Sequence, residues 1–105
     1  MTVAAKDIYS GALTSTLTTP LYTAATSKGA VATSMSICNT TGATVNLTLK
    51  VNGVTRYAAT PVPAGASWFV GPADMRWVIP NGATVTGGAS TAAAIEISIS
   101  GAEIS

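Results

Sequence analysis

The sequence predicts an all-β fold: a single antiparallel β-sandwich of about seven or eight strands, preceded by an extended N-terminal arm. Apolar and polar residues alternate with a period of two along most of the chain, and Gly, Pro and Asn interrupt the alternation at intervals of roughly ten residues. The 105 residues provide one hydrophobic core and leave no room for a second. We therefore expect residues 1–16 to form the arm and residues 17–105 to form the sandwich domain.

The N-terminal part of the chain has the weakest strand signal. Residues 1–16 show little periodicity, which predicts an arm that is either disordered or ordered only against a neighbour. The first extended segment covers about Leu17 to Ala24 and contains Pro20. Because proline cannot donate to a strand ladder, this segment is expected at a sheet edge or at a bulge.

The next two segments alternate clearly. From Ala30 to Asn39, the pattern predicts one face with Val31, Thr33, Met35 and Ile37 and another with Ala32, Ser34, Ser36 and Cys38. In the segment from Thr44 to Val51, the inward face is predicted to carry Val45, Leu47, Leu49 and Val51, and the outward face Thr44, Asn46, Thr48 and Lys50. The pair Asn52-Gly53 that follows predicts a two-residue hairpin turn.

The remaining strands are shorter except for the last. They are expected at about Val54 to Pro61, at "SWFV" (67–70), at Met75 to Ile79, at Ala83 to Thr86 and in "AAAIEISISG" (92–101). In the last segment Ile95, Ile97 and Ile99 face one way, and Glu96, Ser98 and Ser100 face the other.

The composition limits the functions and partners that the chain is expected to have. Although 48% of residues are hydrophobic, many are alanine, so the core is expected to be thin and contacts with other subunits to supplement it. Five scattered Lys and Arg residues give a net charge of +1, which argues against nucleic acid as a partner. A charge fraction of 9% fits a surface covered by neighbours and also an inert solvated β surface. The N-terminal stretch predicts no signal peptide and no membrane span, hence synthesis in the cytoplasm.

Residues that could carry chemistry are few. With no histidine and with Cys38 as the only cysteine, the sequence supports no catalytic triad, no zinc site, no cofactor and no internal disulfide. Cys38 is expected to be a buried structural thiol. The carboxylates that could be paired for glycoside hydrolysis are Asp74 with Glu96 or Glu103. Their turn and strand-face positions favour structural roles, so no catalytic residue is predicted and the chain is expected not to be an enzyme.

The aromatic residues are the candidate interface. Trp68 and Phe69 precede Trp77 across the connection "VGPADMR", so the three side chains are expected to converge on one end of a sheet. They either form core and subunit-interface anchors or a platform that stacks on a sugar, and the scarcity of nearby polar side chains favours the first. Because adjacent residues of a strand point to opposite faces, one of Trp68 and Phe69 must face outward, and we expect it to be Trp68.

Several short motifs carry a resemblance that covers about residues 21–104. They are Leu-Tyr-Thr at Leu21 to Thr23, Ile-Cys-Asn-Thr at Ile37 to Thr40, Pro-Ala-Gly at Pro63 to Gly65, and Ser-Gly-Ala-Glu at Ser100 to Glu103. In these motifs the chain resembles small all-β bacteriophage virion structural proteins of the decoration, neck or tail-associated type. The resemblance implies a virion component present in many copies, often a homotrimer, and it implies no catalytic residue.

The expected function is therefore that of a structural subunit attached to the capsid surface or the neck and tail of a phage, made in the host cytoplasm and located in the virion. Its expected partners are copies of itself and other virion proteins. The alternative is a carbohydrate- or receptor-binding module of a tail fibre, in which a glycan would bind at the aromatic segment.

Overall fold

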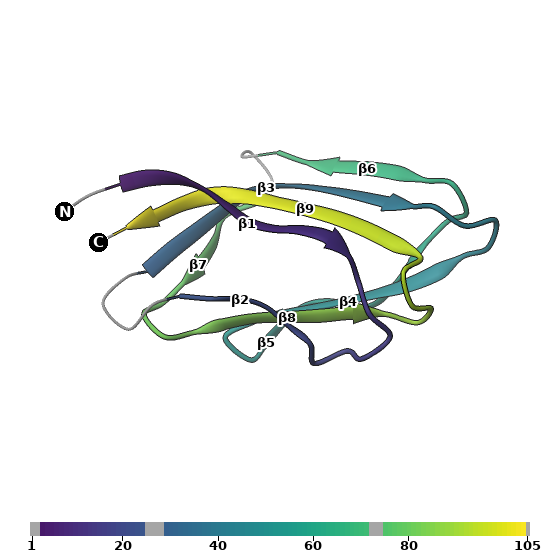
Figure 1. Ribbon diagram of the computed structural model, residues 1–105, viewed down its shortest axis with the longest axis horizontal. Helices are drawn as coiled ribbons and strands as arrows, with labels where there is room; N and C mark the ends of the chain where they lie inside the picture. Colours follow the sequence, from purple (N-terminus) through teal and green to yellow (C-terminus); the bar gives the residue numbers. More distant parts are fainter. Residues whose placement is uncertain (1–2, 25–28, 72–74, 105) are drawn as a thin grey trace.

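The computed structural model describes residues 3–24, 29–71 and 75–104, which form two antiparallel sheets packed as a sandwich (Figure 1). Sheet A has the strand order β1-β9-β3-β6, with β7 also paired to β3, and sheet B has the order β2-β8-β4-β5. The predicted fold class is confirmed. The strands are β1 (Val3–Ala12), β2 (Pro20–Thr23), β3 (Gly29–Asn39), β4 (Val45–Val51), β5 (Val54–Val62), β6 (Ser67–Val70), β7 (Trp77–Ile79), β8 (Thr84–Ala89) and β9 (Ile95–Ile104).

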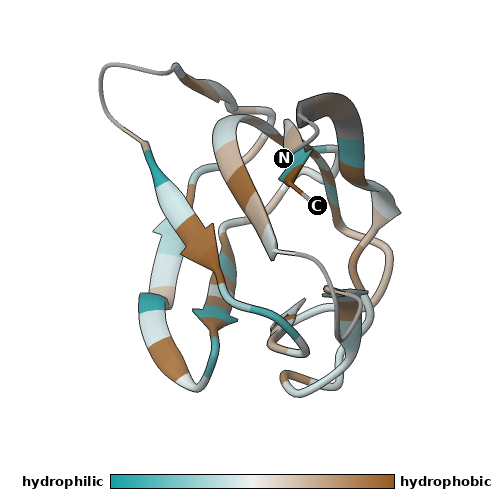
Figure 2. Ribbon diagram, turned by 90° about the vertical axis from the view of Figure 1, so that its left-hand side faces the viewer, coloured by the Kyte–Doolittle hydropathy of each residue, from teal (hydrophilic) through white to brown (hydrophobic). Residues whose placement is uncertain are grey.

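The inner faces of the two sheets form one core. As predicted, the apolar residues of β4 are buried, and so are the three isoleucines of β9 that alternate with polar residues. Figure 2 shows this alternation as hydrophobic and hydrophilic bands along the strands. The large side chains with the lowest exposure are leucine, isoleucine, valine and methionine: Leu13, Met35, Ile37, Leu47, Leu49, Ile79, Ile95, Ile99, Val45, Val51, Val62 and Val85.

A bulge changes which residues of β3 share a face. The pairing of β3 with β9 shifts register between Ala32 and Ser34, so Thr33 is an extra residue in β3. An extra residue reverses the alternation beyond it. Ala32 is therefore buried on the same side as Met35, whereas Val31 is only partly buried. The prediction that Val31 and Met35 lie on one face was wrong for this reason.

The N-terminal residues belong to the sandwich. Instead of an arm outside the domain, Val3–Ala12 form β1, which pairs with β9 along its whole length. A register shift between Asp7 and Tyr9 turns both Ile8 and Tyr9 towards the core. Because this shift interrupts the period of two, the sequence pattern looked too weak for a strand. The predicted boundary at residue 16 was therefore wrong for residues 3–12.

The predicted hairpin between β4 and β5 is confirmed. Asn52 has φ 51° and Gly53 has φ 78°. Positive φ at both central residues is the mark of the type I′ turn, whose twist matches that of two antiparallel strands. The predicted edge position of Pro20 is confirmed as well, because β2 is an outer strand of sheet B.

A buried asparagine joins the two sheets where β3 ends. The Asn39 side chain, which is 1% exposed, donates from Nδ2 to the carbonyl oxygens of Ala43, Val62 and Pro63 at 2.8, 3.0 and 3.2 Å. Its Oδ1 accepts hydrogen bonds from the Thr41 backbone N–H and hydroxyl. The motif at the end of β3 is thus a structural connection to the β4–β5 pair.

Candidate interaction surface

The three aromatic residues of the predicted interface lie along one edge of sheet A. β6 and β7 both pair with β3, at different places: Trp68 is opposite Ile37, and Trp77 is opposite Ala32. Because Ile37 and Ala32 are both buried, the two tryptophans face the core from positions five residues apart on β3. The predicted convergence of the aromatic residues at one end of a sheet was therefore wrong.

Trp77 is a core residue. It is 8% exposed, and its ring meets Tyr57 of β5 edge-on, with ring centroids 6.1 Å apart and planes inclined by 62°. This contact joins the edges of the two sheets. Burial raises the pKa of Tyr57 above its usual value because the charged phenolate is poorly solvated there.

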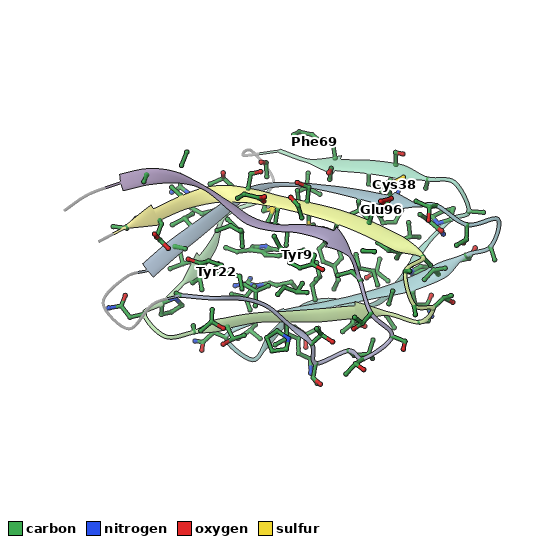
Figure 3. The ribbon with its side chains drawn as sticks, in the orientation of Figure 1. Tyr9, Tyr22, Cys38, Phe69 and Glu96 are labelled. Carbon is green, nitrogen blue, oxygen red and sulfur yellow. The ribbon has the colours of Figure 1, made fainter. Side chains whose placement is uncertain are left out.

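Phe69 is the outward-facing member of the adjacent pair. It is 74% exposed, whereas Trp68 is partly buried and packs against the core. Figure 3 shows the Phe69 ring pointing away from the sandwich. The expectation that Trp68 faces outward was wrong. The neighbouring residues carried the signal: Ala66, Trp68 and Val70 are apolar at alternate positions, which marks their side as the inner one.

Small polar side chains surround Phe69 on the sheet A outer face, which we define as the outward-facing residues of β1, β9, β3, β6 and β7. The strand registers place Ser10, Ser98, Ser36 and Phe69 in one row across four strands. Ser10 and Ser98 hydroxyl oxygens are 3.2 Å apart, and the Ser10 hydroxyl also donates to the Asp7 carboxylate at 3.0 Å. Phe69 therefore projects from a surface of short polar side chains.

A second exposed apolar residue lies on the same face. Val78 of β7 is 58% exposed and pairs with Val31, which in turn is opposite Ala102 of β9. The alternation of Trp77, Val78 and Ile79 could have identified Val78 as outward-facing, but the predicted interface contained only aromatic residues. Phe69 and Val78 therefore make the β6–β7 side of the sheet A outer face its apolar side.

Cys38 also lies on the sheet A outer face. It is partly buried, and its Sγ accepts a hydrogen bond from the Ser67 hydroxyl at 3.6 Å. The prediction of a buried thiol was wrong because Cys38 alternates with Ile37, which occupies the inner face.

Of the candidate carboxylates, Glu96 and Glu103 lie within the described residues, on opposite sides of β9. Glu96 is exposed on the sheet A outer face, opposite Cys38. Glu103 lies on the other side of β9 and accepts a hydrogen bond from the Tyr22 hydroxyl at 3.0 Å, which joins β2 of sheet B to sheet A. Burial, this bond and the Glu103 charge all raise the pKa of Tyr22. Asp74 lies outside the described residues.

The outer face of sheet B has a different polar composition. Its outward positions are rich in threonine: Thr23 and Thr84 hydroxyl oxygens are 3.2 Å apart, and the Thr48 hydroxyl accepts a hydrogen bond from the Ala59 backbone N–H at 3.2 Å. Lys50 is partly buried on the same side. The hydroxyls of Thr23, Thr48 and Thr84 are thus engaged within the sheet.

Within the ranges that the structure covers, no group of three or more His, Cys, Asp or Glu side chains is placed to hold a metal ion. The same ranges contain no helix with the length and hydropathy of a membrane span. No protein-family model matches the sequence, and no curated protein matches it significantly.

Proposed function

We propose that this protein is a structural subunit of a bacteriophage virion, present in many copies and attached to the capsid surface or to the neck and tail. The motifs that carry the resemblance support this proposal. They fall in β2, at the end of β3, in the turn between β5 and β6, and in β9, where they shape strands and turns. Such positions suit a protein whose role is mechanical.

The single observation that carries the proposal is the exposure of Phe69 on the sheet A outer face. A 74% exposed phenylalanine forgoes most of the burial that an aromatic ring can contribute. The ring projects above a row of serines that would allow another protein to approach closely. A neighbouring subunit or virion protein would cover this ring, and repetition over many copies would add many weak contacts together.

Particle incorporation tests the proposal. Particles are purified on a density gradient from lysates in which the chain is made from its own genome, and the chain is quantified against the major particle proteins. We expect it to co-purify at a fixed ratio to those proteins. Its absence from the particles, with soluble chain present in the same lysate, would contradict the virion assignment.

A matched pair of variants connects incorporation to the surface. Phe69→Ser removes the exposed ring from sheet A, and Val54→Ser removes a side chain of comparable exposure, 56%, from β5 of sheet B. We expect Phe69→Ser to lower the ratio of chain to particle and Val54→Ser to leave it unchanged. Equal ratios in both variants would move the attachment surface away from Phe69.

The exposed ring also keeps glycan binding as a second candidate, since a flat face with one projecting aromatic side chain can stack on a sugar. The isolated protein on a glycan array decides between the two functions. Reproducible binding that Phe69→Ala abolishes would favour the carbohydrate- or receptor-binding module. Trp77→Ala is not a suitable probe, because Trp77 is buried in the core.

A further inference from the structure

The strands at the outer edges of the two sheets differ in how they discourage pairing with another strand. Unpaired strand edges are templates for association, and proteins commonly block them with proline, bulges or charge. In sheet B, β2 contains Pro20 and β5 contains Pro61. In sheet A, β1 carries the register shift between Asp7 and Tyr9. On the other side of sheet A, β6 and β7 both pair with β3, and neither contains a proline, a charged residue or a register shift against β3. β6, with four residues, is the longer of the two.

The backbone groups on the open side of β6 can be assigned. The Asn39 N–H donates to the Ala66 carbonyl oxygen at 2.9 Å, so this carbonyl points towards β3, whereas the Ala66 N–H donates to the Pro63 carbonyl oxygen within the turn at 3.1 Å. In an antiparallel ladder, successive residues direct their N–H and C=O groups to opposite sides. The N–H and C=O of Ser67 therefore point away from β3, those of Trp68 point towards it, and those of Phe69 point away again.

This arrangement is self-complementary. If a second copy of β6 runs antiparallel to the first with Trp68 on the two-fold axis, Ser67 lies opposite Phe69 of the other copy, and Phe69 lies opposite its Ser67. Both residues of each pair direct their backbone groups across the junction, so the two pairs form four hydrogen bonds. The two Trp68 residues then form a non-hydrogen-bonded pair, the position at which side chains from adjacent strands approach most closely.

We propose that the protein forms a two-fold dimer through antiparallel pairing of β6 with β6 of a second copy, in this register. The partly buried Trp68 rings pack against each other on the inner side, and each Phe69 ring packs beside Ser67 of the other copy on the outer side. The inference deepens the proposed multi-copy function and rests on it for its biological use. The product is a dimer, unlike the homotrimer that the sequence resemblance implies.

The mass of the free protein tests the dimer. Size exclusion coupled to light scattering should give twice the chain mass of 10.4 kDa, falling to the chain mass on dilution. Ser67→Pro removes an outward-pointing N–H from β6 and the hydroxyl that donates to Cys38, and it keeps the backbone pairing of β6 with β3. We expect this variant to stay folded by circular dichroism and to be monomeric at concentrations where the wild type is a dimer.

A control separates edge pairing from association through the whole face. Ser100→Lys places a charge on the sheet A outer face, on the central strand β9, far from the open edge. We expect this variant to remain a dimer. A dimer that Ser100→Lys disrupts and Ser67→Pro does not would overturn the β6 pairing in favour of face-to-face packing.

Cysteine cross-linking tests the register. In a Cys38→Ser background, Ser67→Cys and Phe69→Cys proteins are prepared separately and mixed before oxidation. The proposed register places these two positions opposite each other, at a Cα separation of about 5.5 Å that suits a disulfide. We expect the mixture to cross-link faster than either protein alone. Faster cross-linking of either single variant would overturn the register, as a wild-type monomer or trimer at all concentrations would overturn the dimer.

These results are independent of the particle experiment. A dimer with the expected cross-link, found for a chain that does not enter particles, would support the pairing and contradict the virion function. A chain that enters particles but is monomeric when free and unaffected by Ser67→Pro would support the virion function and contradict the pairing.

Discussion

The two sheets share one core, but their outer faces and edges differ in composition. Sheet B presents threonines that bond within the sheet, and both of its edges contain proline. Sheet A presents serines and a projecting Phe69, and its edge formed by β6 and β7 contains no proline. We therefore expect association at the unprotected edge and at the exposed ring of sheet A rather than over its polar face as a whole.

The largest expected effects test whether this difference is confined to the outside. Ile99 of sheet A and Leu47 of sheet B are both completely buried. We expect Ile99→Ala and Leu47→Ala each to lower the free energy of unfolding by about 2–5 kcal/mol, because both leave a cavity in one common core. Denaturant titration followed by fluorescence measures the two values.

Val54→Ala is the control for this pair, since Val54 is exposed and its truncation should change the free energy of unfolding by less than about 0.5 kcal/mol. If only one of the two core variants were strongly destabilised, the two sheets would contribute unequally to the stability of the core. The difference between the sheets would then apply to their inner faces as well as to their outer faces.

The next effect concerns the hairpin that closes one end of sheet B. Gly53 has φ 78°, a conformation that strains a β-branched side chain, so Gly53→Val should cost about 1–3 kcal/mol of unfolding free energy. Thermal melting measures the shift. Gly42→Ala is the matched control, because a Cβ at Gly42 would meet open space and its φ is not in the left-handed range. An unchanged midpoint for Gly53→Val would show that the turn adapts.

Much of the fold could be predicted because alternation and turn chemistry are local. Val45 to Val51 reads as a strand in isolation, and Asn52-Gly53 specifies its turn without knowledge of any partner. What could not be predicted depends on pairing. The bulge at Thr33 and the register shift before Tyr9 arise where two strands meet, and each reverses the faces beyond it.

The candidate surface shows the same limit. The sequence required that Trp68 and Phe69 point to opposite sides, and this holds. Which of them faces outward depends on pairing with β3, where Trp68 meets the buried Ile37. The hydrophobicity of the two rings favoured neither residue, and only the apolar alternation of Ala66, Trp68 and Val70 indicated the inner side. The alternation of β7 indicates that Val78 faces outward, but only the pairing of β7 with β3 places Val78 on the same face as Phe69.

A smaller effect concerns the contact that joins the two sheets near the C-terminal end of β9. Tyr22→Phe removes the hydrogen bond to Glu103 and should lower the free energy of unfolding by about 0.5–1.5 kcal/mol near neutral pH. Burial, the bond and the Glu103 charge raise the pKa of Tyr22 in the folded protein above its usual value. Denaturant titration of both proteins at several pH values measures the effect.

The sign of the pH dependence follows from that shift. A raised folded pKa means that the folded protein holds the phenol proton more tightly, so this stabilisation is complete below about pH 10 and is lost as the pH rises further. Tyr22→Phe should therefore weaken the alkaline loss of stability. The burial of Tyr57 leaves a residual loss, because the pKa of Tyr57 is raised as well. Identical alkaline profiles for the variant and the wild type would show that Tyr22 does not contribute.

The smallest expected effect is the sharpest test of the contrast within β6. Phe69→Ser should change the unfolding free energy of the monomer by less than about 0.5 kcal/mol, because the ring is 74% exposed and has little burial to lose. Trp68→Ser should cost several times more, since Trp68 packs against the core. Denaturant titration under dilute conditions, where light scattering shows a monomer, separates folding from association. If Phe69→Ser destabilised the dilute monomer as much as Trp68→Ser does, the ring would already be covered within the chain. The outer side of sheet A would then expose no more apolar surface to a partner than sheet B does. The two sheets would differ only in the unprotected edge at β6.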